Sequence, residues 1–152
     1  MAHEPRLIEV PERHFLVVRA TLRAEQIADF VPQAYADISR QASTLGVEPA
    51  SGPMAHYLDF HGPIFEMEAA FRFAGPVTGQ GSVVATTEPP GRAVTVEHQG
   101  PYQTLDRAYG AVEAWISEHS LEATGESWEE YLRMPGEAPD GEPLTRLDLT
   151  VR

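Results

Sequence analysis

Two stretches of the sequence decide the fold: residues 31–58, VPQAYADISRQASTLGVEPASGPMAHYL, and residues 105–132, LDRAYGAVEAWISEHSLEATGESWEEYL. A shift of 74 positions, from residue 31 to residue 105, aligns them without a gap. The matched positions include Ala34 with Ala108, Tyr35 with Tyr109, Ile38 with Val112, Tyr57 with Tyr131 and Leu58 with Leu132. These residues hold equivalent places in the hydrophobic pattern, and self-similarity at one spacing indicates repeated units. We therefore predict two copies of one unit.

The helix of the first copy follows from its apolar spacing. Apolar residues recur every three to four positions from Ile27 to Leu45, which is typical of an amphipathic helix. Gly46 follows directly and is a natural residue for the end of a helix. Pro32 either kinks this helix or, as we expect, lies in its first turn, where its missing N–H costs nothing.

Strands flank both predicted helices. In the first copy we expect an extended segment over Leu7–Thr21, interrupted near Pro11, and strands over Met54–Phe60 and Ile64–Phe73. In the second copy we expect strands over Val83–Thr87, Arg92–His98, Ser127–Arg133 and Leu144–Val151, with a helix between Leu105 and His119. Each copy therefore has the order βαββ.

These elements predict an α+β fold of two pseudo-symmetric βαββ repeats that form antiparallel sheet, with helices on one face and a ligand groove between the repeats. We expect one domain over residues 1–152, because a chain of this length builds one sizeable core. Repeat one covers about residues 5–73, a glycine- and proline-rich connector about 74–81, and repeat two about 82–152.

The composition indicates which kinds of partner and which compartment the protein is suited to. Acidic residues outnumber basic ones 23 to 11, for a formal net charge of −12, which disfavours direct nucleic-acid binding. Solubility alone also explains such a charge. The absence of cysteine favours a reducing compartment, so we expect a cytoplasmic protein, and no apolar run is long enough to span a membrane. The sequence leaves the oligomeric state open.

Cofactor motifs are missing from the sequence. The six histidines are scattered without metal-ligand spacing, so we predict no metal site. There is no Gly-x-Gly-x-x-Gly or Walker-type loop, so we expect no nucleotide cofactor and no other cofactor.

The candidate site centres on Glu129 in the predicted strand Ser127–Arg133. Alternation along a strand places Glu129 and Tyr131 on one face and Trp128, Glu130 and Leu132 on the other. If the helices cover the Leu132 face, Glu129 and Tyr131 project into the groove beside Tyr57. The alternative is that Glu129 lies on the solvent face of an edge strand.

Two further residues are candidates for the ligand site. Glu68 alternates away from the apolar face of its strand, where a solvated position is equally compatible with the pattern. Trp115 lies on the apolar stripe of the second helix, where it serves the core, the floor of a pocket, or both.

The second copy also carries motifs that resemble a known family. These are Val94-Thr95-Val96-Glu97-His98-Gln99-Gly100-Pro101-Tyr102, then Ala108-Tyr109 and Trp115-Ile116, then Trp128-Glu129-Glu130-Tyr131-Leu132, Pro135 and Thr145. They are similar to the GyrI-like small-molecule-binding family, which includes effector-binding domains of AraC-type and MerR-type multidrug regulators. The resemblance implies a doubled βαββ fold with the family's pocket glutamate at Glu129, followed by Tyr131. Because the whole chain is assigned to this domain, no helix-turn-helix segment is predicted.

Three functions follow from this resemblance. The first is binding of bulky apolar or aromatic small molecules of the drug or xenobiotic type, either neutral or cationic, with Glu129 as the pocket acid and Tyr131, Tyr57, Trp115 and Glu68 as candidate ligand contacts. The alternative is a hydrolase that opens cyclopropane-containing alkylating compounds, with Glu129 as general base and Tyr131 or Tyr57 bonding the leaving oxygen. The third is a modulator of DNA gyrase, for which the negative charge is too dispersed along the chain.

Overall fold

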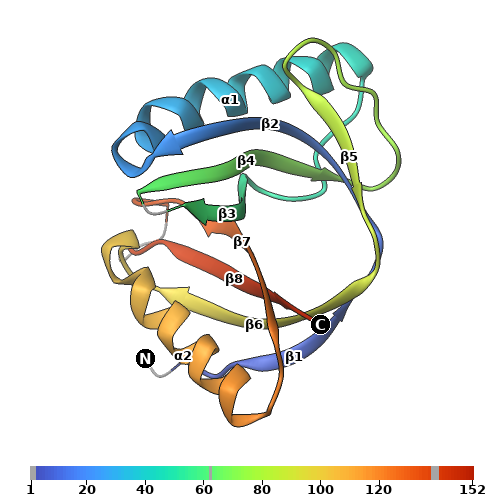
Figure 1. The fold of residues 1–152 in the computed structure, drawn as a ribbon. Helices are drawn as coiled ribbons and strands as arrows, with labels where there is room; N and C mark the ends of the chain where they lie inside the picture. Colours follow the sequence, from blue (N-terminus) through green and yellow to red (C-terminus); the bar gives the residue numbers. More distant parts are fainter. Residues whose placement is uncertain (1–2, 62, 138–140) are drawn as a thin grey trace. The chain divides into compact units, whose positions relative to one another are not determined.

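The computed structural model describes residues 3–61, 63–137 and 141–152. The chain divides into two compact units, residues 11–90 and residues 1–10 with 91–152. Figure 1 shows the elements of each unit coloured along the chain.

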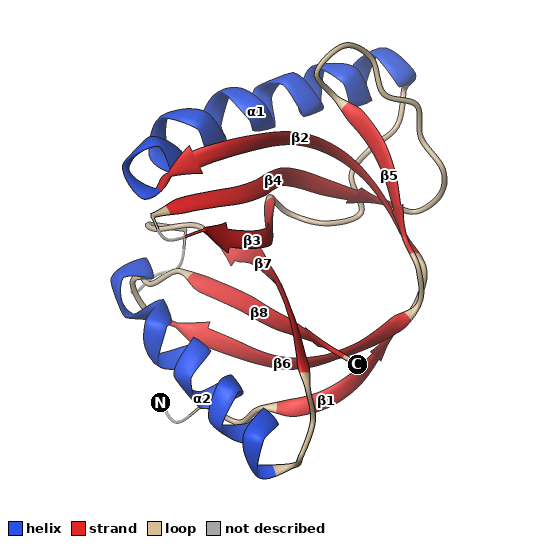
Figure 2. Cartoon of the chain, viewed as in Figure 1, coloured by secondary structure: helices blue, strands red, loops and turns tan. Residues whose placement is uncertain are grey.

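The described residues of the unit 11–90 form one long helix and four strands. Its elements are β2 (Arg13–Arg23), α1 (Ala24–Leu45), β3 (Met54–His61), β4 (Ile64–Phe73) and β5 (Val84–Glu88). The strands lie in the order β3-β4-β2-β5 and pair antiparallel. Helix α1 covers one face of this sheet (Figure 2).

The described residues of the second unit likewise form one α-helix and four strands, together with a short 3-10 helix. Its elements are β1 (Arg6–Val10), β6 (Gly91–Gln99), the short 3-10 helix η1 (Tyr102–Thr104), α2 (Leu105–Glu118), β7 (Ala123–Arg133) and β8 (Leu144–Val151). The strands lie in the order β1-β6-β8-β7 and pair antiparallel. Helix α2 packs on one face of them.

The predicted α+β class is confirmed. Within each unit the strands pair antiparallel, and one α-helix packs on one face of them. The predicted strands and helices all form, with ends within a few residues of those expected. That a ligand groove lies between the repeats stays a prediction.

Each unit has its own core beneath its helix. Under α1 the core is formed by Leu16, Val18, Ala34, Ile38, Ala42, Ala69, Phe73 and Val83. Under α2 it is formed by Val94, Val96, Ala108, Val112, Ile116, Leu147, Leu149 and Val151. In both helices the buried residues recur every three or four positions, which is the spacing that places one stripe against a sheet.

Pro32 lies inside α1 and not in its first turn, so that expectation is wrong. The helix begins at Ala24, and the side-chain oxygen of Gln26 accepts the N–H of Arg23 at 2.8 Å, which stabilises an early start. Because the residues at this end are mostly polar, the apolar spacing does not indicate that the helix begins at Ala24. Pro32 has no N–H to donate to the carbonyl of Ala28, so this turn lacks one hydrogen bond.

The short strands pair across the sequence repeats. β1 belongs to repeat one in the sequence but pairs with β6, and β5 precedes β6 but pairs with β2. Pro11 ends β1, and Pro89 with Pro90 ends β5, because proline cannot donate to a strand ladder. Strand β1 of repeat one therefore lies in the compact unit that holds most of repeat two, and β5 of repeat two lies in the unit that holds most of repeat one.

Among the helices that the structure describes, none combines the length and the apolar character needed to cross a membrane.

Candidate functional site

Glu129 lies on the α2 side of β7. It is the direct cross-strand partner of Leu147, which packs in the core under α2. Side chains of such partners lie on the same face of the sheet. The condition that the helices cover the Leu132 face is therefore not met: α2 covers the face of Glu129 and Tyr131. Alternation is observed as predicted, and Trp128 is buried on the opposite face.

Two tyrosine hydroxyls hold the Glu129 carboxylate. Tyr109 of α2 donates to Oε2 at 2.6 Å, and Tyr131 of β7 donates to Oε1 at 2.7 Å. The Tyr109 hydroxyl also lies 3.3 Å from the hydroxyl of Ser127. Glu129 is only 6% exposed, so the alternative of a solvent-facing carboxylate is wrong.

Burial raises the pKa of Glu129 above its ordinary value, although the two tyrosine hydrogen bonds act in the opposite direction. Removal from water disfavours the charged carboxylate, whereas hydroxyl donors favour it. Because the burial effect is the larger, a carboxylate at this position is incompletely compensated.

Tyr102 adds a third aromatic ring. Its ring packs edge-to-face on Tyr131, with 5.6 Å between centroids and 63° between planes. Burial raises the pKa of the Tyr102 hydroxyl, and the negative charges of Glu129 and Glu137 raise it further. We call Glu129 with Tyr102, Tyr109 and Tyr131 the tyrosine–glutamate site.

No cationic side chain among the described residues contacts the Glu129 carboxylate. Other buried acids are paired. Asp148 receives two hydrogen bonds from Arg146, at 3.1 and 3.2 Å. The tyrosine–glutamate site therefore contains a buried acid that lacks a positive partner in the described parts of the chain.

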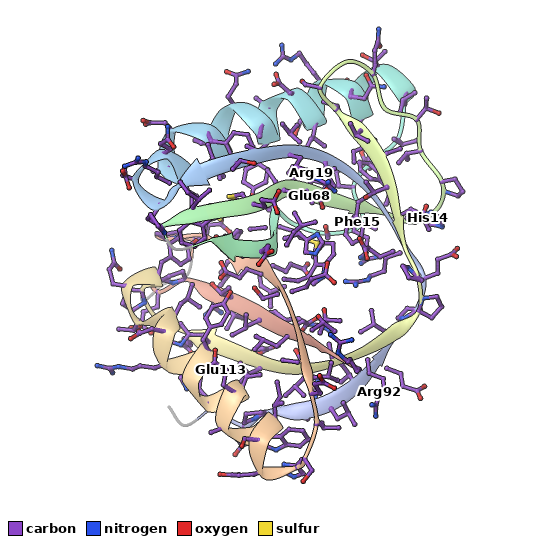
Figure 3. The ribbon with its side chains drawn as sticks, viewed as in Figure 1. His14, Phe15, Arg19, Glu68, Arg92 and Glu113 are labelled. Carbon is purple, nitrogen blue, oxygen red and sulfur yellow. The ribbon has the colours of Figure 1, made fainter. Side chains whose placement is uncertain are left out.

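Glu68 is also buried, but it has two basic partners. Arg19 donates to Oε2 at 3.1 and 2.8 Å, and His56 Nδ1 lies 2.8 Å from Oε1. Arg19 and Glu68 are direct cross-strand partners on β2 and β4 (Figure 3). Burial raises the pKa of Glu68, but the bonds to His56 and Arg19 outweigh it and hold that pKa below its ordinary value. Glu68 therefore has the properties of a structural ion pair.

Trp115 and Tyr57 each have other contacts of their own. Trp115 packs against the core under α2 and stacks on His119, with 3.7 Å between ring centroids. Tyr57 lies on β3 in the other compact unit and packs edge-to-face on Phe65. The structure thus brings Tyr131 to Glu129, whereas ligand roles for Tyr57, Trp115 and Glu68 stay predictions.

Tyr109 is the contact that sequence reasoning missed. The apolar stripe of its helix favoured a core position, and its half-buried ring does pack against the core cluster under α2. Its hydroxyl nevertheless reaches the acid. A tyrosine on an apolar stripe has a polar tip that needs a partner when buried. This need for a hydrogen-bond partner was the signal in the sequence that could have indicated the contact.

Comparison with known proteins gives a family and several similar folds. The model of the GyrI-like small molecule binding domain matches residues 3–152. The EcmrR C-terminal domain is similar with a TM-score of 0.80 at 20% identity, over 100% of this chain and 99% of that chain. A structure of SAV2435 bound to tetraphenylphosphonium has a TM-score of 0.69 at 12% identity, over 98% and 94%. A hydrolase from Listeria innocua has a TM-score of 0.72 at 16% identity, over 98% and 92%.

The similar EcmrR chain in a complex with DNA is longer, and the present chain spans 57% of its length. At these identities the structural likenesses show the fold alone. No curated protein matches this chain.

Proposed function

Because the chain belongs to the family of GyrI-like small molecule binding domains, as its motifs predict, we propose that it binds bulky aromatic or apolar cations. The ligand class is that of lipophilic drugs and xenobiotics, and Glu129 is the acid that receives the positive charge. The tyrosine–glutamate site is the place of binding.

One observation carries this proposal: Glu129 is a buried carboxylate whose described partners are hydroxyls. Burying a charge without a counter-charge is costly, and a bound cation removes that cost. At about 4 Å and an effective dielectric near 20, an ion pair is worth about 4 kcal/mol before desolvation is counted. Charge at this one residue is therefore enough to determine which ligands bind.

The three tyrosines suit the same ligand. Aromatic faces attract cations through the ring quadrupole by about 0.5–2 kcal/mol each, depending on solvation. Tyr102 and Tyr131 already pack edge-to-face, so their rings form an apolar wall beside the acid. Because both carboxylate oxygens accept tyrosine hydroxyls, we expect a ligand to draw close to Glu129 only when at least one ring turns aside.

The comparisons support a cationic ligand in one respect. The similar protein SAV2435 has been solved with tetraphenylphosphonium, a bulky aromatic cation. We therefore choose this ion as the probe for the present chain.

The test is a calorimetric titration of tetraphenylphosphonium and of neutral triphenylphosphine oxide. We expect Glu129→Gln to weaken the cation at least tenfold and to change the neutral compound by less than about twofold, because only the cation uses the charge. Glu130→Gln is the matched control, since Glu130 is the adjacent acid on the opposite face. Equal affinity of the cation for the native protein and Glu129→Gln would refute the proposal.

A hydrolase is the second candidate, favoured by the raised pKa of Glu129 and by the Listeria innocua hydrolase among the similar folds. A carboxylate with a raised pKa is a stronger general base. In this reaction water adds to a ring carbon of a cyclopropane while a ring C–C bond breaks, and Glu129 accepts the proton of water. A carbonyl conjugated to the ring takes up the electrons as an enolate, and Tyr131 donates a hydrogen bond to its oxygen. The enolate then takes the proton back from Glu129, so the product gains one water.

Mass spectrometry of a cyclopropane-containing alkylating agent incubated with the protein tests this second candidate. We expect a product heavier by one water with the native chain and none with folded Glu129→Gln. Undiminished turnover in that variant rules out Glu129 as the base.

A further inference from the structure

Thr145 on β8 is a fully buried residue, with 0% of its surface exposed. Its hydroxyl oxygen Oγ1 has no hydrogen-bond partner among the described residues. Buried hydroxyls are nearly always paired, because leaving one unpaired costs stability. A buried group of this kind calls for an explanation, and a bound ligand is one such explanation.

The pairing of the strands places Thr145 beside the tyrosine–glutamate site. Thr145 is the direct partner of Tyr131 on β7 and of His98 on β6. It alternates with Leu147, the partner of Glu129, so all these side chains lie on the α2 face. Glu129 and Thr145 are diagonal neighbours, whose Cβ atoms in antiparallel sheets lie about 7 Å apart.

The polar groups around Thr145 have partners of their own. The Tyr131 hydroxyl donates to Glu129, and His98 Nε2 lies 2.9 Å from the hydroxyl of Thr104. His98 Nδ1 lies 2.9 Å from a ring nitrogen of His3. Among the described residues, Thr145 is therefore a buried hydrogen-bonding group of this face that is left for a ligand, next to an acid that attracts a cation.

We propose that Thr145 is a specificity-determining residue that accepts a hydrogen bond from an N–H group of the bound cation. This rests on the proposed binding of cations at Glu129. A protonated amine carries its positive charge on a nitrogen whose N–H groups are hydrogen-bond donors. The threonine hydroxyl has two lone pairs and can accept a hydrogen bond from such an N–H group. A quaternary ammonium presents only methyl groups there and leaves Thr145 unpaired. The site therefore prefers a protonated amine to a quaternary ammonium of the same shape.

Two probes that differ in this one group test the preference. They are 1-pyrenylmethyl-dimethylammonium, which has one N–H, and 1-pyrenylmethyl-trimethylammonium, in which a methyl group replaces it. We expect the native protein at pH 7 to bind the N–H probe about tenfold more tightly, because hydrogen bonds to charged groups have about this worth. Isothermal titration calorimetry gives both affinities.

Thr145→Val assigns the preference to its residue. Valine has the same shape without the hydroxyl, so the ratio of the two affinities is expected to fall to within twofold of one. Since the hydroxyl has no partner in the free protein, the melting temperature of Thr145→Val is expected to be unchanged or higher. Thr150→Val is the matched control, because Thr150 lies on the same strand but alternates to the opposite face. It should keep the tenfold preference.

The outcomes separate the two proposals. If the native protein binds tetraphenylphosphonium but does not distinguish the two pyrene probes, the role of Thr145 is wrong and cation binding stands. The role of Thr145 is also wrong if Thr145→Val keeps the preference, including the case where only Glu129→Gln loses it. If no cation binds the native protein, the proposed function fails, and the role of Thr145 fails with it.

Discussion

Glu129 and Glu68 are both buried carboxylates, yet their surroundings act on them in opposite directions. Glu68 has Arg19 and His56 as partners, which hold its pKa low despite burial. Glu129 has two hydroxyls, and burial raises its pKa. The charged form is thus stabilised by the fold at one residue and destabilised at the other. Retaining a destabilised charge is what we expect of a residue kept for binding rather than for stability.

Glu129→Gln is expected to stabilise the free protein increasingly as the pH rises from about 4.3 through the raised pKa of Glu129. A carboxyl whose pKa is raised by folding is favoured below its unfolded value of about 4.3, and this advantage is lost as the pH rises through the raised pKa. Glutamine carries no such charge at any pH. Urea unfolding of both proteins at several pH values measures the difference.

Glu68→Gln provides the contrast, because the sign is reversed. A lowered pKa contributes stability above about pH 4.3, which is lost as the pH falls through the folded value. We expect this variant to lose about 1–3 kcal/mol at pH 7, a range reduced because the Arg19 side chain is 62% exposed. Parallel pH profiles for the two variants would contradict the assignment of opposite environments.

At the scale of elements, α1 contains a local conflict in Pro32. Proline inside a helix costs about 3 kcal/mol relative to alanine, although tertiary packing offsets part of it. Pro32 is exposed and lies nine residues into the helix, so no buried contact depends on its ring. The helix forms because Ala34, Ile38 and Ala42 pack on the sheet.

Pro32→Ala is therefore expected to raise the free energy of unfolding by about 1–2 kcal/mol. The gain is smaller than the helix scale alone suggests, because proline also restricts the unfolded chain. Urea unfolding measures it, with Gln33→Ala as an exposed control in the same turn. A loss of stability in Pro32→Ala would show that the ring supports the helix in some other way.

The sequence predicts the elements well and their pairing less well. Periodicity identifies both helices and all the long strands, because each buries one face. It does not reveal that β1 pairs with β6 and β5 with β2, since strand pairing depends on distant contacts. Alternation divides β7 into two faces correctly, but cannot decide which face α2 covers, because Glu129 and Trp128 are both buried. The contact of Tyr109 with Glu129 forms because α2 covers the Glu129 face, so the sequence pattern alone does not identify it.

At the scale of the whole molecule, the two repeats differ where the site lies. The 74-residue shift aligns Tyr109 and Tyr131 with Tyr35 and Tyr57. In the same alignment, Ala55 of repeat one holds the position of Glu129 in repeat two. The hydroxyl of Tyr35 accordingly donates to the carbonyl of Met54, at 2.9 Å, instead of to a carboxylate. The matched positions therefore hold tyrosines in both copies and the acid in one.

One bound cation per chain is therefore expected. Calorimetric titration of tetraphenylphosphonium should give a stoichiometry near one, and Glu129→Gln should abolish this binding event without revealing a second of similar affinity. A stoichiometry near two in the native protein would mean that the negative surface, from a net charge of −12, and not Glu129 determines binding.

The most direct test of the central claim is the titration of the Glu129 carboxyl itself, followed by carbon NMR in protein labelled at its glutamate carboxyl groups. We predict a pKa above the ordinary glutamate value in the free protein, because burial outweighs the two tyrosine hydrogen bonds. Saturation with tetraphenylphosphonium should lower this pKa, since a nearby positive charge favours the carboxylate. The resonance is assigned by its loss in Glu129→Gln. A pKa that the cation leaves unchanged would contradict the account.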